Sequence, residues 1–260
     1  MMGWLRALVL LSGLVVGLSQ AAEGLRDEDH ELNPDTPKTL AGEMITLKTE
    51  DGMPFQVYAV GPEDAPRGML VIHEWWGLND HIRGWADRLA EQGYRAMAVD
   101  LHNGQVATTP DQARALIGAV DQQEANAKHR AVLQALQAPG RKLGVIGWCF
   151  GGGQSLQASL AAPELVSATV IYYGPLVTDV AQLQRLRAPV LGIFGTRDTS
   201  ITVDKVKSFQ QAMQQAGKPL EVHFYEADHA FANPSGNRYN GAAAQQAWEV
   251  TKAFLDKHLQ

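Results

Sequence analysis

The sequence of 260 residues contains a single cysteine, Cys149, and charged residues make up only 19% of it. One cysteine cannot form a disulfide within the chain, which excludes a small disulfide-stapled scaffold. The net charge of −6 provides no attraction to nucleic acid, and we expect none as a partner. A dense cluster of His and Cys is also missing, and Gly77 stands where an H-E-x-x-H zinc motif starting at His73 needs its second histidine. We therefore expect neither a metal nor a cofactor.

The apolar run at 7–18 is too short to cross a bilayer comfortably. Arg6 precedes it, and Ser19 and Ala21 place small residues at the two positions that a signal peptidase reads. We predict a signal peptide over 1–21 that is cleaved after Ala21, leaving a periplasmic or secreted protein without a membrane attachment. The alternative is that this run is a membrane anchor or a buried helix.

Downstream of this leader the composition changes twice. Residues 22–42 are polar and contain two prolines, which is typical of an extended lead-in. Residues 43–260 show no internal repeat and no linker, so we predict one domain over this range. We expect this domain to be a monomer.

Apolar strand-like runs alternate with longer helix-like segments through most of the domain. The predicted strands are 44–47, 55–60, 69–73, 94–99, 143–147, 168–173, 190–194 and 220–225. The predicted helices are 80–92, 111–136, 152–161, 203–216 and 242–258. The first two strands form a hairpin at a sheet edge, and the later ones are continuously apolar, as in a parallel sheet covered on both faces. The sequence thus predicts an α/β fold with a mostly parallel sheet of about eight strands and helices on both faces.

Cys149 lies at the centre of Gly147-Trp148-Cys149-Phe150-Gly151, between a predicted strand and a predicted helix. This G-x-nucleophile-x-G pattern is the nucleophile elbow of α/β-hydrolases, with Cys in place of the usual Ser. The helix N-terminus favours a thiolate, and the Phe150 N–H is the natural first donor to an oxyanion. The alternative is a structural glycine turn around a buried cysteine.

A thiol nucleophile needs a base, and three histidines follow Cys149 in the sequence. His258 stands near the end of a helix and His223 within a strand, whereas His229 lies in a loop beyond the carboxyl end of that strand. Catalytic residues of open α/β sheets lie at that edge, so we predict His229 as the base. The alternative is a surface loop histidine.

The acid that orients this base should follow an earlier strand. Asp198, in the loop after the strand VLGIF, is placed to do so. The competing acids are Asp179, after an earlier strand, Asp204, at a helix start, and Asp228, too close to His229 in sequence to reach its ring easily. We predict Asp198, with a capping or turn role as the alternative.

Glu74 follows the strand GMLVI, in the segment from which the second oxyanion-hole N–H comes in this fold. A carboxylate at that strand end can pair with the thiol or with the imidazolium. The alternative is an ordinary loop salt bridge.

Five motifs occur together in the order HEWWGLND, VDLH, GWCFGG, GTRD and DHAF. In this order and spacing the chain resembles the dienelactone hydrolase family of the α/β-hydrolases from about Met44 to Leu259. The resemblance implies a Cys–His–Asp triad, a glutamate that helps to activate the thiol, and two backbone oxyanion donors. These map onto Cys149, His229 and Asp198, onto Glu74, and onto the amides of Phe150 and Trp75.

The chain departs from the family in the arginines that bind the substrate carboxylate. The corresponding neighbourhoods are HNGQVATTP and ANPSG, with no arginine close to the expected positions. Dienelactone itself is therefore not the expected substrate. Aromatic residues indicate instead a less charged pocket; they are Trp75, Trp76, Trp148 and Phe231.

Together these features predict a secreted or periplasmic hydrolase of small-molecule carboxylic esters or lactones that works through a covalent acyl-enzyme on Cys149. The alternative is a catalytically idle α/β-hydrolase fold that binds a small apolar ligand in the same pocket. A peroxidase-like redox thiol is a third possibility, but it lacks a resolving cysteine.

Overall fold

The structure is a computed structural model that describes residues 39–260. The predicted signal peptide at 1–21 and all but the last residues of the predicted lead-in at 22–42 lie outside the described residues. Within the described range, no helix combines the length and the apolar character needed to cross a membrane.

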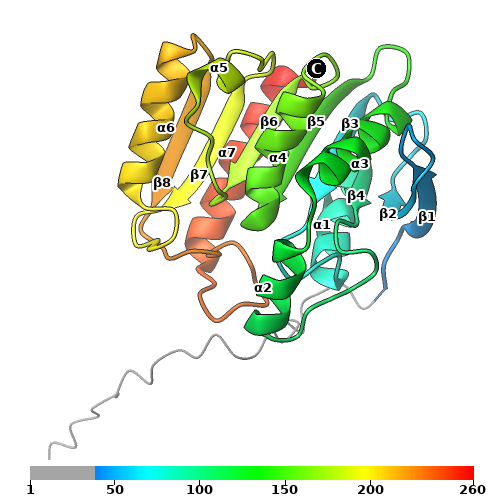
Figure 1. The fold of residues 1–260 in the computed structure, drawn as a ribbon, viewed down its shortest axis with the longest axis horizontal. Coiled ribbons are helices and arrows are strands. Elements are labelled where there is room, and N and C mark those ends of the chain that lie inside the picture. The colour runs from blue at the N-terminus through cyan, green and yellow to red at the C-terminus, as the bar shows by residue number, and fades with distance from the viewer. Residues whose placement is uncertain (1–38) are drawn as a thin grey trace, which may run out of the picture.

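A single sheet of eight strands forms the centre of the molecule (Figure 1). The strands are β1 (Glu43–Lys48), β2 (Pro54–Val60), β3 (Arg67–Ile72), β4 (Tyr94–Val99), β5 (Lys142–Trp148), β6 (Ala168–Tyr172), β7 (Val190–Gly195) and β8 (Leu220–Tyr225). Their order across the sheet is β1-β2-β4-β3-β5-β6-β7-β8. Strand β2 pairs antiparallel with both of its neighbours, and all other pairs are parallel. The predicted mostly parallel sheet and its edge hairpin are confirmed.

Helices cover both faces of this sheet (Figure 1). They are α1 (Asp80–Glu91), α2 (Pro110–Gly118), α3 (Gln122–Ala135), α4 (Phe150–Ala161), α5 (Val180–Leu183), α6 (Val203–Gln215) and α7 (Gly241–His258). Met69 and Val71 of β3 pack in a core with α1 and α7, whereas Leu70 and Ile72 pack in another core with α3 and α4. Both faces of the strand are thus buried, which explains why its sequence is continuously apolar.

The predicted helix at 111–136 is wrong as one element, because the chain breaks it into α2 and α3. The Asp121 side chain accepts hydrogen bonds from the amides of Gln123, at 2.8 Å, and Glu124, at 2.9 Å, and so begins a new helix. The prediction missed this capping residue between the apolar run at 115–120 and the polar residues after it. The short helix α5 was also not predicted.

The carboxyl ends of β3 and β5 to β8 meet at one edge of the sheet. Glycines let the backbone approach closely there: a side chain on Gly147 would collide with the Gly151 carbonyl, and one on Gly151 with the carbonyls of Ile72 and His73. The start of α4 therefore packs directly on the end of β3. This edge is where the sequence placed its candidate catalytic residues.

Candidate active site

Cys149 connects β5 to α4 with φ 54° and ψ −120°, a conformation that residues other than glycine rarely adopt. Its amide donates to the Tyr172 carbonyl at 3.0 Å, and its carbonyl accepts from Gly152 at 2.9 Å. These bonds and the neighbouring glycines hold the strained turn. The side chain is consequently presented at the N-terminus of α4 and only partly buried.

Three predicted site residues lie in line at this edge. The Cys149 Sγ is 3.2 Å from Nε2 of His229, whose Nδ1 is 2.7 Å from Oδ2 of Asp198. Oδ1 of Asp198 accepts hydrogen bonds from the amides of Ser200, at 2.7 Å, and Ile201, at 2.8 Å. Because the carboxylate can only accept, the Nδ1 of His229 carries the proton toward it, and Nε2 faces the sulfur. The loops after β7 and β8 thus bring an acid, an imidazole and a thiol into one hydrogen-bonded chain.

The electrostatics of this chain favour a positive imidazolium. Burial opposes a charge on His229, but hydrogen bonds and negative charge from Asp198 and Cys149 outweigh it and raise the pKa to about 10. Burial likewise works to raise the pKa of Asp198, yet the hydrogen bond and charge of His229 lower it overall. The site therefore stabilises a positive imidazolium on His229 beside an ionised Asp198 at neutral pH.

The competing acids lie away from the imidazole or serve other purposes. Asp179 caps α5 by accepting from the Gln182 amide at 2.9 Å, and Asp204 stands in the first turn of α6. Asp228 lies 3.5 Å from the Arg197 guanidinium on the surface. Among the histidines, His223 pairs with Glu221 on β8, and His258 packs against Phe254 in α7.

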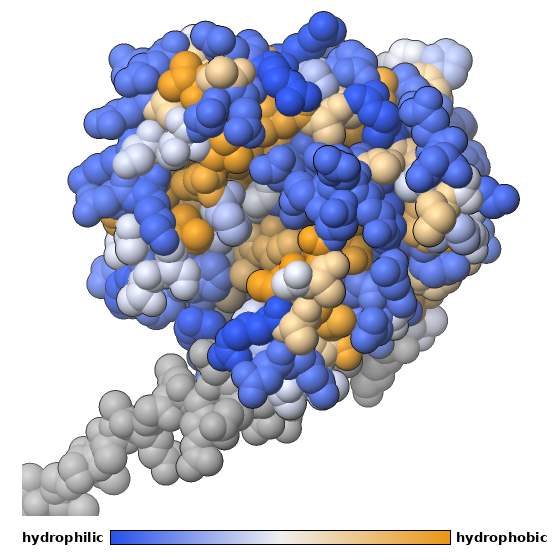
Figure 2. Space-filling model, viewed as in Figure 1, coloured by the Kyte–Doolittle hydropathy of each residue, from blue (hydrophilic) through white to orange (hydrophobic). Residues whose placement is uncertain are grey.

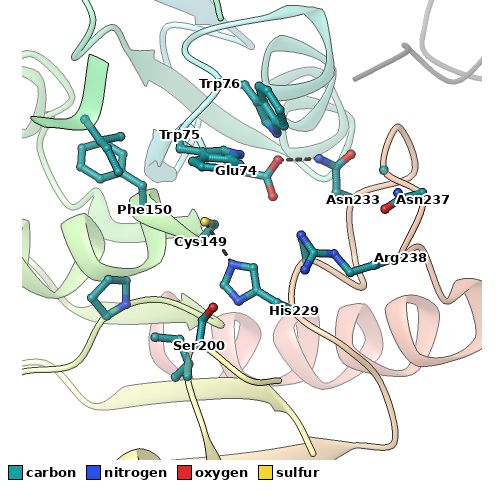
Figure 3. A pocket seen from close by; sticks show the side chains of 15 residues that line it. Glu74, Trp75, Trp76, Cys149, Phe150, Ser200, His229, Asn233, Asn237 and Arg238 are labelled. Carbon is teal, nitrogen blue, oxygen red and sulfur yellow. Dashed lines mark hydrogen bonds between the residues drawn. The ribbon is translucent and has the colours of Figure 1, made fainter. Parts of the chain in front are cut away.

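Glu74 is buried in the wall of the same pocket, with 2% of its surface exposed. Its Oε2 accepts a hydrogen bond from Nδ2 of Asn233 at 2.5 Å, while Oε1 has no partner within residues 39–260 (Figure 3). Burial raises its pKa to about 7, and the charge of His229, the bond from Asn233 and the charge of Arg238 act in the opposite direction. The carboxylate thus pairs directly with Asn233, a residue that sequence reasoning missed, and interacts with His229 through space.

The two predicted oxyanion donors both belong to residues that line the pocket. Phe150 is the first residue of α4, and Trp75 follows Glu74 in the loop after β3. Neither amide donates to a backbone carbonyl in another part of the described chain. The arrangement leaves both N–H groups available to a ligand.

A cavity of about 360 Å³ opens over Cys149. Figure 2 shows hydrophobic residues gathered in a hollow on this face of the molecule between hydrophilic ones. The lining residues are Glu74, Trp75, Trp76, Ile117, Cys149, Phe150, Pro175, Ser200, Ile201, His229, Ala230, Asn233, Gly236, Asn237 and Arg238. The part of the chain that the structure describes contains no group of three or more His, Cys, Asp or Glu side chains that could hold a metal ion.

The pocket is more charged than the sequence predicted, because an arginine outside the two expected neighbourhoods lines it. Arg238 lies in the cavity wall opposite Phe150, on the loop that also carries Asn233 and Asn237 (Figure 3). Sequence reasoning looked for a cation directly after the DHAF motif and stopped before this residue. The loop between β8 and α7 folds back over the site, so an arginine farther along the chain reaches the pocket.

The sequence is similar to a known protein family and to individual proteins. A family model described as the dienelactone hydrolase family matches residues 55–259. "Protein usf" of Aquifex pyrophilus is 29% identical, over 84% of this chain and 99% of that protein. A protein of Aquifex aeolicus named "Putative carboxymethylenebutenolidase" is 27% identical, over 84% of this chain and all of its own length.

A solved structure gives the same result at the level of the fold. The crystal structure of a protein from Klebsiella pneumoniae, described as a "Putative Dienelactone Hydrolase", is 28% identical, with a TM-score of 0.74. The similarity covers 83% of this chain and 98% of that one. The sheet order, the elbow and these matches agree: the chain belongs to the dienelactone hydrolase family, a family of α/β-hydrolases.

Proposed function

We propose that this protein hydrolyses small-molecule carboxylic esters or lactones through a covalent acyl-enzyme on Cys149. The observation that carries the proposal is the hydrogen-bonded chain from Asp198 through His229 to the sulfur at a strained strand-to-helix turn. A thiol nucleophile requires a neighbouring base to ionise it, and that base requires an orienting acid. This site supplies all three groups.

In the acylation step the Cys149 thiolate attacks the carbonyl carbon, and the carbonyl π electrons move onto the oxygen. The amides of Phe150 and Trp75 stabilise this oxyanion. When the tetrahedral intermediate collapses, the C–O bond to the alcohol breaks, and His229 donates its Nε2 proton to the leaving oxygen. A thioester on Cys149 and a neutral imidazole remain.

In the second step a water molecule attacks the thioester carbonyl, and His229 accepts a proton from that water. The C–S bond then breaks, which releases the carboxylic acid and restores the thiolate beside the imidazolium. Asp198 stays ionised throughout and stabilises the positive ring. The cycle balances without a metal or a cofactor.

Glu74 is assigned a supporting part in ionising the thiol. Its pKa of about 7 lets it exchange a proton near neutral pH, and its charge interacts with that of His229. In this role the Glu74 carboxylate accepts the thiol proton, which then passes to Nε2 of His229 and leaves a thiolate, an imidazolium and an ionised Glu74. Asn233 keeps the carboxylate in the pocket wall by its hydrogen bond.

The cavity favours a small, partly apolar substrate with a polar or anionic substituent. Trp75, Trp76 and Phe150 form the aromatic part of the wall, and Arg238 with Asn237 forms a polar end (Figure 3). A guanidinium in such a wall recognises a carboxylate or another oxygen-rich group.

We also propose that the enzyme works as a monomer in the periplasm or outside the cell. The proposed location rests on the leader-like sequence of residues 1–21. Fractionation of producing cells and size-exclusion chromatography of the mature protein test the two points separately.

The central test is hydrolysis of a short-chain aryl ester by the purified mature protein under reducing conditions, with Cys149→Ala and His229→Ala alongside. Wild type should turn over, and both variants should lose about 10³-fold or more in kcat. Equal rates for wild type and variants would contradict the assignment. A wild type that hydrolyses no ester or lactone in a panel, and whose Cys149 resists alkylation, would support the idle ligand-binding alternative.

A further inference from the structure

His73 lies directly behind the loop that carries Glu74 and Trp75, with 0% of its surface exposed. Its Nδ1 is 2.6 Å from the backbone carbonyl oxygen of Glu74. Its Nε2 accepts a hydrogen bond from the backbone amide of Leu101, in the loop after β4, at 3.1 Å. The imidazole therefore bridges two loops at the carboxyl edge of the sheet, and it touches neither the sulfur nor His229 through any of these bonds.

These two partners determine the state of the ring. An amide N–H can only donate and a carbonyl can only accept, so Nε2 must be unprotonated and Nδ1 must carry the hydrogen. The ring is then neutral and in one tautomer. Burial lowers the pKa of His73 to about 4, which agrees with a neutral ring at neutral pH.

The bond to Glu74 also orients the next amide. The peptide between Glu74 and Trp75 is trans, as are all peptides of the described chain, so its C=O and N–H point in opposite directions. With the carbonyl directed into the protein interior toward His73, the Trp75 N–H is directed the other way, toward the cavity. The Gly77 amide donates to the same carbonyl at 3.2 Å and strengthens this orientation.

The loop after β4 also holds the loop after β3 at a second point. The Trp76 carbonyl accepts a hydrogen bond from the Ala107 amide at 2.8 Å, and Ala107 belongs to the loop after β4 that also contains Leu101. The carbonyls of Glu74 and Trp76, one residue before and one after Trp75, are thus tied to buried partners. The Trp75 peptide cannot rotate without breaking the bond to His73.

We propose that His73 is a positioning residue for the oxyanion hole: as a neutral Nδ1–H donor it holds the Glu74 carbonyl inward and so aims the Trp75 N–H at the developing oxyanion. The proposal rests on the acyl-enzyme chemistry of the proposed function. It separates two properties of Cys149. Attack on an ester needs the oxyanion hole, whereas alkylation by iodoacetamide displaces iodide at carbon and develops no oxyanion.

The experiment compares these two reactions in three variants. His73→Leu removes both hydrogen bonds; His73→Asn keeps an N–H donor, since its amide nitrogen takes the place of Nδ1. His129→Leu is the matched control: His129 is equally buried, and neither of its ring nitrogens has a partner in residues 39–260. The readouts are the acylation rate from the burst of an aryl ester and the rate of Cys149 alkylation as a function of pH.

For His73→Leu we expect acylation to slow by about 10²-fold, the size of the loss when one oxyanion donor is removed. Its rate of Cys149 alkylation should stay within about twofold of the wild-type rate at every pH. His73→Asn should recover most of the acylation rate, and His129→Leu should match wild type in both reactions. An unchanged acylation rate in His73→Leu, or an equal loss of acylation and alkylation, would overturn the proposal.

A measurement on the wild type keeps the proposal open to refutation even if His73→Leu does not fold. Nitrogen-15 NMR of the imidazole should show a neutral ring protonated at Nδ1 from pH 5.5 to 9, and the opposite tautomer or a charged ring would contradict it.

Failure of the proposed function would give a different result from failure of the role of His73. In that case wild type itself would show no acylation by any ester or lactone, whatever the state of His73.

Discussion

His229, beside Cys149, and three buried histidines elsewhere in the fold differ in charge. His229 has 14% of its side chain exposed, and its pKa is raised to about 10. His73 and His102, whose rings lie near Phe150, and His129 are more deeply buried, and burial lowers their pKa values to about 4, 3 and 3. Burial alone therefore does not decide the charge of a histidine.

The neighbours account for the difference. Burial acts to lower the pKa of all four rings. His229 offsets it with a carboxylate on one nitrogen and a thiol on the other, whereas the other three rings lie near the ammonium of Lys128 and near one another, so their charges would repel. The rings of His73 and His102 are 4.5 Å apart. The surroundings of His229 thus stabilise a charged ring, whereas those of the other three histidines keep the rings neutral, and His73 uses its neutral ring to bond two loops.

Replacing Asp198 with Asn should have the largest effect, because it removes the carboxylate that sets His229 apart. The pKa of His229 should fall from about 10 toward its ordinary value near 6.5, and kcat/KM for an aryl ester should drop by about 10³-fold. Alkylation of Cys149 at pH 7 should slow as well. If Asp198→Asn kept the wild-type rate of Cys149 alkylation, the Asp198 carboxylate would not be what keeps His229 charged beside the thiol.

Replacing Glu74 with Gln should lower kcat/KM by about 10²-fold, the lower end of what a general base contributes. The pKa of Glu74 is about 7, so its ionised fraction rises with pH through neutrality. Wild type should show a limb in the pH–rate profile that rises near pH 7, and Glu74→Gln should lack it. The comparison of the two profiles under identical buffers checks this, and a limb that persists in the variant would assign it to another group.

Acid should destabilise the fold through the neutral histidines. Above about pH 6.5 these rings are neutral in both states, and as the pH falls the unfolded chain binds protons that the folded chain refuses until pH 4 to 3. Each ring then costs about 1.4 kcal/mol of unfolding free energy per pH unit. Urea unfolding at pH 6, 5 and 4 gives the unfolding free energy as a function of pH. In His129→Leu this free energy should fall less steeply with decreasing pH, by about the amount that one ring contributes. An identical slope in the variant would show that His129 is protonated in the folded state.

Replacing Arg238 with Ala should have the smallest effect. We expect KM for an anionic ester to rise about 10-fold and KM for a neutral ester of equal size to change less than twofold, because only the former loses a charge-assisted contact. The pKa of Glu74 should also rise further, since the charge of Arg238 lowers it. Equal changes for both esters would argue that Arg238 shapes the cavity without recognising charge.

The sequence was sufficient for features that depend on neighbouring residues. Apolar runs predicted the eight strands, and the glycines around Cys149 predicted a tight turn between β5 and α4. The order of motifs also singled out Asp198 and His229. In the structure His229 lies within hydrogen-bond distance of both Asp198 and Cys149. Their catalytic role stays a prediction until the variants are measured.

The tertiary structure alone decided contacts between residues far apart in the chain. Asn233 reaches Glu74 across 159 positions, Arg238 enters the cavity on a returning loop, and His73 meets Leu101 because β3 and β4 are adjacent. Local patterns encode strands, turns and caps, since these depend on backbone preference and on which faces are buried. Which side chain completes a buried hydrogen bond depends on how loops pack at the sheet edge, and no local pattern carries that information.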